Sequence, residues 1–74
     1  MTNPRNFRLR VGKIIRAHRG NISLRELEQL SGVDHSTLHD WEHGRGDVTV
    51  LALHRLASIL GQGLTRDIAE YITR

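Results

Sequence analysis

The residues of this chain best suited to chemistry lie in one short stretch, VDHSTLHDWEHGRGD, at residues 33–47. His35, His39 and His43 are four residues apart, so on a helix they share one face. Two histidines at this spacing can hold a zinc ion. All three span about 12 Å of a straight helix, too far for one tetrahedral ion with bonds of about 2 Å. The spacing therefore predicts a polar helix face, and no metal or other cofactor is expected.

The same stretch has the sequence features of a short helix with a defined start and end. Asp34 is a suitable N-cap for a helix over residues 35–43, and Gly44 permits the backbone turn that closes one. At 100° per residue, Leu38 and Trp41 point one way, toward a core. The opposite face is polar and carries His35, Ser36, His39, Asp40 and His43.

A second short helix precedes this one, and a glycine joins the two. Ser23 and Glu26 have the capping-box spacing, in which the serine hydroxyl accepts from the third amide and the glutamate reaches back. Leu27 and Leu30 supply its apolar face, and Gly32 ends it. Two such helices form a helix-turn-helix, whose second helix can project a narrow polar face into the major groove of DNA.

The first part of the chain has helical periodicity over residues 7–19. Its apolar stripe consists of Phe7, Val11, Ile14, Ile15 and His18. Because His18 falls within that stripe, we expect it to pack against neighbours and not to bind a ligand. Gly12 is the one glycine that lies inside a periodic segment instead of between segments.

Two more helices follow the polar stretch. Thr49 can cap a helix over residues 50–60, and Thr65 can cap a last helix that ends at residue 71 or 72. No strand pattern appears. The chain is therefore expected to be all-α: residues 1–74 form one compact bundle of about five short helices. The positions expected to face its core from the last two helices are Leu53, Leu56, Ala57, Leu60, Ile68, Ala69 and Ile72.

Charge is distributed unevenly along the 74 residues. The formal net charge is +3, but residues 1–19 hold six Lys and Arg and no acid, whereas residues 20–74 have a net charge of −3. A concentrated basic field suits a polyanion such as DNA. The sequence has no cysteine, no apolar run long enough to cross a membrane and no signal-peptide pattern, so a cytoplasmic protein is expected.

Three stretches, VGKIIRAHR, SLRELEQLSGVDHSTLHDWEHG and TVLALHRLASILG, together resemble a known family. In their order and spacing they are similar to the phage-repressor/Cro-like (XRE-type) helix-turn-helix over roughly residues 9–68. The resemblance implies a lambda-repressor-like fold with its helix-turn-helix at residues 23–44. It further implies a bacterial or phage transcription regulator of the repressor type, which binds specific double-stranded DNA as a homodimer. No enzyme is expected, since there is no cysteine and no carboxylate pair with a shared pocket.

The helix faces and the resemblance together assign the DNA contacts. Two positions depart from the family: Leu24 stands where glutamine often contacts phosphate, and Glu28 stands where alanine allows close helix packing. The backbone amides at the start of the second helix can still bind phosphate, while Glu28 must tilt outward or find a partner. The expected DNA-binding residues are Ser23, Leu24, His35, Ser36, Thr37, His39, Asp40, His43, Arg45, Thr49, Arg16 and Arg19.

Two further roles follow from the sequence. The resemblance implies that Glu42 pairs with an arginine of the first helix, Arg19 or Arg16. The last helix, residues 65–73, is a candidate dimer surface through Tyr71 and Ile72, although a core role is equally compatible. Leu51 falls where an exposed residue is expected and is a third dimer candidate.

Two alternatives use the same fold. In the first, the chain is a protein-interaction module, antitoxin-like or an adaptor, and its acidic and histidine-rich face docks onto a protein. In the second, weaker alternative, the chain is a metal sensor, in which two of the three histidines hold an ion together with an acid or a second chain.

Overall fold

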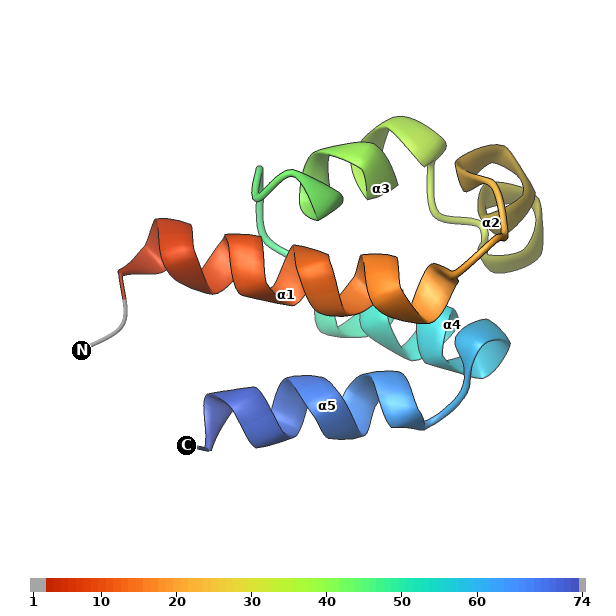
Figure 1. Ribbon diagram of the computed structural model, residues 1–74. Helices are drawn as coiled ribbons and strands as arrows, with labels where there is room; N and C mark the ends of the chain where they lie inside the picture. Colours follow the sequence, from red (N-terminus) through yellow and green to blue (C-terminus); the bar gives the residue numbers. More distant parts are fainter. Residues whose placement is uncertain (1–2, 74) are drawn as a thin grey trace.

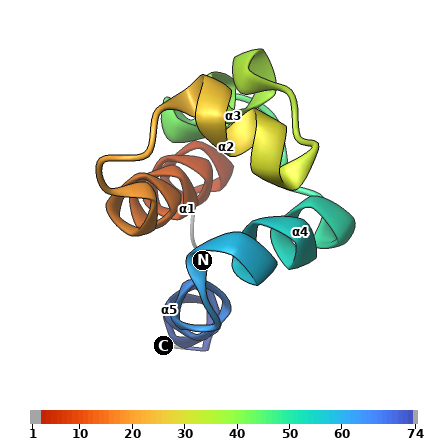
Figure 2. The same ribbon diagram turned by 90° about the vertical axis from the view of Figure 1, so that its right-hand side faces the viewer.

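The computed structural model describes residues 3–73, so residues 1, 2 and 74 of the expected domain lie outside the description. Its helices are α1 (Pro4–Arg19), α2 (Leu24–Ser31), α3 (His35–Glu42), α4 (Val50–Leu60) and α5 (Gly63–Ile72). Helix α1 packs against α3 on one side and α5 on the other, and α4, which lies beside α1, packs against α2 and α5 (Figures 1 and 2). Within residues 3–73 there is no strand. The expected all-α bundle of five helices with a helix-turn-helix is confirmed.

One side chain from each helix meets at the centre of the molecule. These five residues are fully buried: Ile15, Leu27, Leu38, Leu56 and Leu64. Around them are Val11, Val33, Trp41, Ala57 and Ile68, also buried. Because every helix contributes to one core, none of these helices needs to be stable alone, and α3 is held mainly by α1 and α2.

Capping side chains set most helix starts where the sequence predicts them. Ser23, Asp34 and Thr49 each accept a hydrogen bond from an amide in the first turn of the helix that follows. The predicted start of the first helix at about residue 7 is wrong, because Asn3 Oδ1 accepts from the Arg5 amide at 2.8 Å and the helix begins at Pro4.

The predicted start of the last helix is also wrong. Thr65 does not cap it but lies inside α5, which begins at Gly63. The earlier start lets Leu64 enter the core, where it is fully buried. Ile68 lies on the same helix face as Leu64 and is also buried, whereas Ala69 is exposed and Ile72 is 58% exposed. The two buried positions are four residues apart, so α5 presents a narrower apolar stripe than the sequence suggests.

Helix α2 likewise buries less than expected. Leu27 is fully buried, but Leu30 is 53% exposed. Leu30 is about 60° around the helix from Leu27, and α2 is held in the fold by its contacts with α3 and α4. Leu27 is therefore the one buried side chain of α2, and Leu24 packs partly buried against the same core.

His18 packs within the fold, as its place in the apolar stripe predicts. The ring is partly buried, and its Nε2 lies 2.7 Å from Asp67 Oδ2. This contact joins α1 to α5 on the side away from α3.

Three aspartates have a lowered pKa, each because the folded chain stabilises its charged form. The largest contribution is a hydrogen bond from the Ser36 amide for Asp34, from Arg8 for Asp47 and from His18 for Asp67. A carboxyl group whose pKa is lowered by folding stabilises the fold at any pH above its unfolded value, which is about 4. That stabilisation is lost as the pH falls through the lowered, folded value.

Acid should therefore destabilise the fold below about pH 4. We expect the melting temperature, followed by circular dichroism, to change little between pH 7 and pH 5 and to fall steadily below pH 4. At pH 7 the melting temperature of the Asp67→Asn variant should be lower than that of wild type. Below pH 4 it should decrease less steeply with falling pH. A wild-type melting temperature that stays constant down to pH 2 would contradict this expectation.

Candidate nucleic-acid interface

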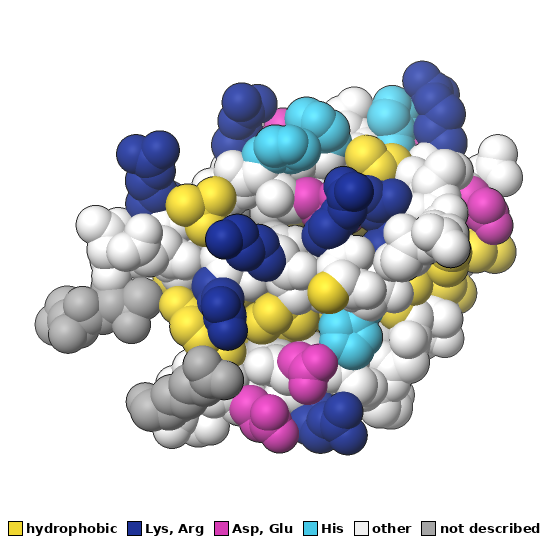
Figure 3. Space-filling model, viewed as in Figure 1, with side chains coloured by type: hydrophobic (Ala, Val, Ile, Leu, Met, Phe, Trp, Pro, Cys, Tyr) yellow, Lys and Arg dark blue, Asp and Glu magenta, His cyan; other side chains and the backbone are white. Residues whose placement is uncertain are grey.

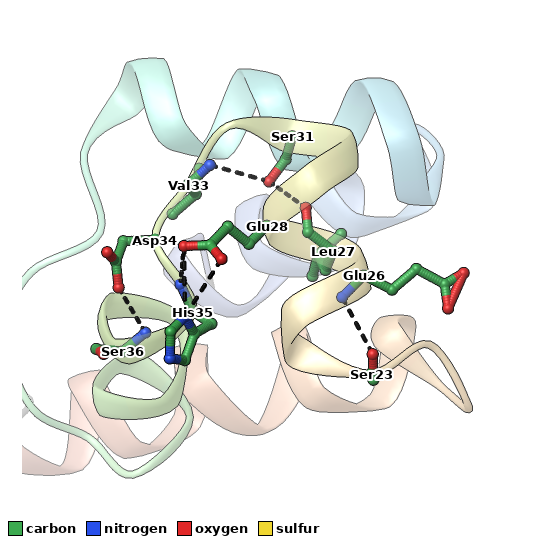
Figure 4. A network of polar contacts seen from close by, with 9 residues as sticks. All are labelled: Ser23, Glu26, Leu27, Glu28, Ser31, Val33, Asp34, His35 and Ser36. Carbon is green, nitrogen blue, oxygen red and sulfur yellow. Dashed lines mark hydrogen bonds and ion pairs between the residues drawn. The ribbon is translucent and has the colours of Figure 1, made fainter.

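The turn between α2 and α3 is set by Ser31 and Gly32. Ser31 Oγ donates to the Leu27 carbonyl at 2.7 Å and accepts from the Val33 amide at 3.2 Å (Figure 4). Gly32 has φ +78°, a left-handed conformation that glycine adopts without steric cost. At the other end of α2 the capping box is half formed. Ser23 Oγ accepts from the Glu26 amide at 3.1 Å, which is one of the two bonds of the box. The Glu26 carboxylate points away from Ser23 in Figure 4 and does not complete the second.

Glu28 is the polar link between the two helices. One of its carboxylate oxygens accepts from the His35 backbone amide at 3.1 Å, and both lie 3.3 Å from His35 Nδ1 (Figure 4). The partner that this glutamate needs is therefore the first residue of α3. As a result, His35 is partly buried and its ring is held against α2.

Helix α3 also lies directly against α1. A Cβ atom built on Gly12 would be 2.1 Å from the Trp41 carbonyl oxygen and 3.1 Å from the Glu42 Cα. No side chain fits in that space, so Gly12 lets the two backbones approach each other. Its place inside a periodic segment was the sequence signal for this contact.

Beside that contact, Arg19 and Glu42 form the ion pair that the resemblance implies. Arg19 Nε is 2.7 Å from one Glu42 oxygen and Nη2 is 3.0 Å from the other, in a two-pronged arrangement. Arg19 Nη1 donates to the Ile22 carbonyl at 2.7 Å. The side chains of Arg19 and Glu42 are only 10% and 3% exposed, and the more exposed Arg16 lies 3.8 Å from Glu42.

This pairing changes the role expected for Arg19. Each of its three nitrogens has a partner within the chain, and the side chain is largely buried. Arg19 is therefore a structural residue here, which argues against the contact with DNA expected from the sequence. Arg16 has a 65% exposed side chain and stays a candidate for that contact.

The polar side of α3 is exposed as predicted from its periodicity. Ser36, His39 and His43 are exposed, Asp40 is half-exposed, and Thr37 is partly buried beside them. The rings of His39 and His43 stack with centroids 4.2 Å apart, and His43 Nδ1 lies 2.8 Å from the His39 carbonyl oxygen. Figure 3 shows histidines over α3, with Lys and Arg side chains beside them and across α1.

The three histidines do not converge on one point. His35 faces Glu28, whereas His39 and His43 stack on each other. Within residues 3–73, one group of possible metal ligands lies close together: one ligand atom each of Glu28, Asp34 and His35 lies within 4.8 Å of the others. One carboxylate oxygen of Glu28 and one of Asp34 already accept backbone amides of α3, so these acids serve the helix start.

The segment after α3 is held against α1. Gly44 has φ +76°, and a Cβ there would be 2.6 Å from Leu9 Cδ2, so Leu9 packs on this turn. Arg8 Nε pairs with Asp47 Oδ1 at 2.7 Å. Neither contact was predicted: Leu9 lies outside the apolar stripe of α1, and Arg8 and Asp47 are 39 residues apart in sequence.

The backbone-contact candidates lie at the ends of this unit. Arg45 is 71% exposed, and its Nη1 lies 3.8 Å from Asp40 Oδ1. Ser23 and Thr49 are N-caps of α2 and α4, and both are exposed. Leu24, the first residue of α2, is partly buried against the core.

The dimer candidates differ in exposure. Tyr71 is partly buried, with its ring 5.7 Å from that of Phe7 and the Arg10 guanidinium 5.7 Å from its centroid. Leu51 and Ile72 are 59% and 58% exposed. Ile72 borders a shallow pocket of about 150 Å³, which Phe7 and Trp41 also line.

These features define a class of protein: a small helical bundle in which α2 and a glycine turn hold a polar helix on the surface. A helix-turn-helix family matches residues 13–66, which is most of the chain. The chain therefore belongs to the helix-turn-helix family of the phage-repressor/Cro-like (XRE) type. This is a family of DNA-binding regulatory domains and not of enzymes.

No curated protein and no solved structure is a match for the sequence. Among the residues that the structure describes, no helix is both long enough and apolar enough to cross a membrane.

Proposed function

We propose that this protein is a transcription regulator of the Cro/repressor type that binds specific sequences of double-stranded DNA. In this proposal α3 enters the major groove and presents His35, Ser36, His39 and Asp40 to the base edges. The main support for the proposal is that three separate contacts fix the exposed polar helix α3 to the rest of the domain. These are the Glu28–His35 link, the close approach at Gly12 and the buried Arg19–Glu42 pair.

Phosphate contacts would come from around that helix. Arg45 follows α3 and is exposed, and Arg16 is exposed on the adjoining side of α1. The first turns of α2 and α4, at Ser23, Leu24 and Thr49, offer backbone amides whose partial positive charge attracts anions. His43, with Thr37 beside it, completes the expected contact surface.

The proposal includes a homodimer in the cytoplasm. Repressors of this type bind two half-sites, one for each subunit, so a symmetric pair doubles the contact with DNA. Leu51 and Ile72 support this because each leaves a large apolar side chain more than half exposed. Tyr71 is the weaker of the three candidates, because its ring already packs on Phe7.

Measuring affinity for a random-sequence duplex across a salt series tests the proposal. We expect binding at about 50 mM salt that weakens steeply by 200 mM, since each neutralised phosphate adds about 0.9 to the logarithmic slope. Arg45→Gln should lower that slope by about 1. Arg66→Gln is the matched control: Arg66 is also 71% exposed and lies 3.7 Å from an aspartate, but it is on α5. Wild-type protein that binds no duplex at 50 mM salt would refute DNA binding.

One observation favours a second candidate function. The exposed face of α3 has an acid and no Arg, Lys, Asn or Gln, which are the side chains most often used to read bases. If duplex binding fails, the protein-interaction module remains, with this face docking onto a protein.

A further inference from the structure

The exposed face of α3 has an unusual hydrogen-bonding character. The side chains that most often read bases carry N–H donors, and this face has none of them. Its polar groups are three imidazoles, one carboxylate and the hydroxyl of Ser36. What the face can recognise therefore depends on which imidazole nitrogens carry a proton.

The contact of His43 with the backbone fixes its tautomer. Its Nδ1 lies 2.8 Å from the carbonyl oxygen of His39, and a carbonyl oxygen can only accept. Nδ1 must therefore carry the proton that it donates. In the neutral ring the other nitrogen, Nε2, is then an acceptor.

Glu28 fixes the tautomer of His35 in the same way. Both oxygens of its carboxylate lie 3.3 Å from His35 Nδ1, and an ionised carboxylate can only accept. The same carboxylate accepts from the His35 backbone amide, which holds the ring at the start of α3. His35 Nε2 is therefore also an acceptor when the ring is neutral. In this arrangement Glu28 is a positioning residue, which acts on DNA only through His35.

Asp40 adds a third acceptor. Its carboxylate is half-exposed and has only a loose contact, 3.8 Å, with Arg45. When the imidazoles are neutral, the polar groups of α3 are thus biased toward accepting hydrogen bonds. In the major groove the donors are the N4 amino group of cytosine and the N6 amino group of adenine, whereas guanine and thymine present acceptors and a methyl group.

We propose that α3 reads the exocyclic amino groups of cytosine and adenine, using His35 Nε2 and the Asp40 carboxylate as acceptors, with His43 Nε2 as a third. The inference rests on the proposed function and specifies the chemistry of the bases it reads. It differs from the common arginine–guanine contact, in which the protein donates to the base.

The test begins with selection of bound duplexes from a random pool at pH 8, where imidazoles are ordinarily neutral. Cytosines of the selected site are then replaced one at a time by N4-methylcytosine, and adenines by N6-methyladenine. These bases still pair, but the amino hydrogen facing the groove is replaced by a methyl group. We expect at least one replacement to weaken binding about tenfold or more. Replacing guanines with 7-deazaguanine, which removes an acceptor, should leave affinity unchanged.

A variant separates acceptor reading from simple charge. Asp40→Ala removes both acceptor oxygens together with one negative charge. It should reduce the penalty for methylation at one position of the site to less than about twofold. Glu70→Gln on α5 is exposed and removes the same charge away from this face, and it should retain the full penalty.

The outcomes are distinguishable. Tight binding of a selected site that tolerates every amino methylation, or that depends on guanine N7 instead, would overturn the inference and leave the proposed function intact. An Asp40→Ala methylation profile identical to that of wild type would show that Asp40 reads no amino group. Absence of binding to any duplex would refute the proposed function itself.

Discussion

Replacing Glu42 with alanine is expected to lower the free energy of unfolding by about 3–5 kcal/mol. The Arg19 side chain is only 10% exposed, and Glu42 supplies the partner for two of its three nitrogens. Without Glu42, a buried guanidinium would keep only the Ile22 carbonyl, with Arg16 as a second cation nearby. Such a loss is a large part of the stability of a domain of this size. Urea unfolding, followed by the fluorescence of Trp41, the only tryptophan, would measure it.

Two controls show whether burial is the cause. The double variant Arg19→Met/Glu42→Leu removes both charges and should recover at least about 2 kcal/mol relative to Glu42→Ala, because apolar replacements of a buried pair are often neutral or better. Asp47→Ala breaks a pair with the same 2.7 Å separation, but Asp47 is 79% exposed, so its effect should be small. If the double variant unfolds as easily as Glu42→Ala, the unpaired charge is not the cause.

Features of the fold that depend on residues close together in the sequence were predictable from the sequence. The caps at Ser23, Asp34 and Thr49 and the limits of α4 follow from local hydrogen bonding and from apolar spacing. The start of α5 was not predictable in this way. A threonine inside the first turn looks like a cap, and only the burial of Leu64 shows that the helix begins earlier.

In the candidate site, too, some features were predictable from the sequence and others were not. The direction in which each side of α3 faces follows from 100° per residue, and the exposed polar face was found that way. The contacts of individual side chains depend on how the helices cross, which no single-helix pattern specifies. Thus the contact of Glu28 with His35 could not be predicted from the sequence, and the pairing that withdraws Arg19 from the surface was expected only from the family resemblance.

The crossing of α1 and α3 is where a single methyl group should have the largest effect on packing. Gly12→Ala would place Cβ 2.1 Å from the Trp41 carbonyl oxygen, and backbone atoms cannot move aside as a side chain can. The helices would have to separate, and we expect a net loss of about 2–3 kcal/mol even after the gain of about 1 kcal/mol in helix propensity. The melting temperature should fall by about 10 °C or more.

The sign of the change is informative, because alanine in an open helix position would stabilise the protein relative to glycine. Lys13→Ala, at the neighbouring exposed position, controls for substitution in α1 and should change stability by less than about 0.5 kcal/mol. A Gly12→Ala protein that melts at or above the wild-type temperature would contradict the close approach.

The losses of stability expected for Gly12→Ala and for Glu42→Ala should not be independent. The Cβ added at Gly12 would also lie 3.1 Å from the Glu42 Cα, so moving α3 away strains the Arg19–Glu42 pair as well. The double variant Gly12→Ala/Glu42→Ala should therefore lose less than the two single variants do together, because part of each loss is the same displaced contact. Additive losses would mean that Gly12 and the ion pair hold α3 separately, so that α3 has two independent attachments to α1.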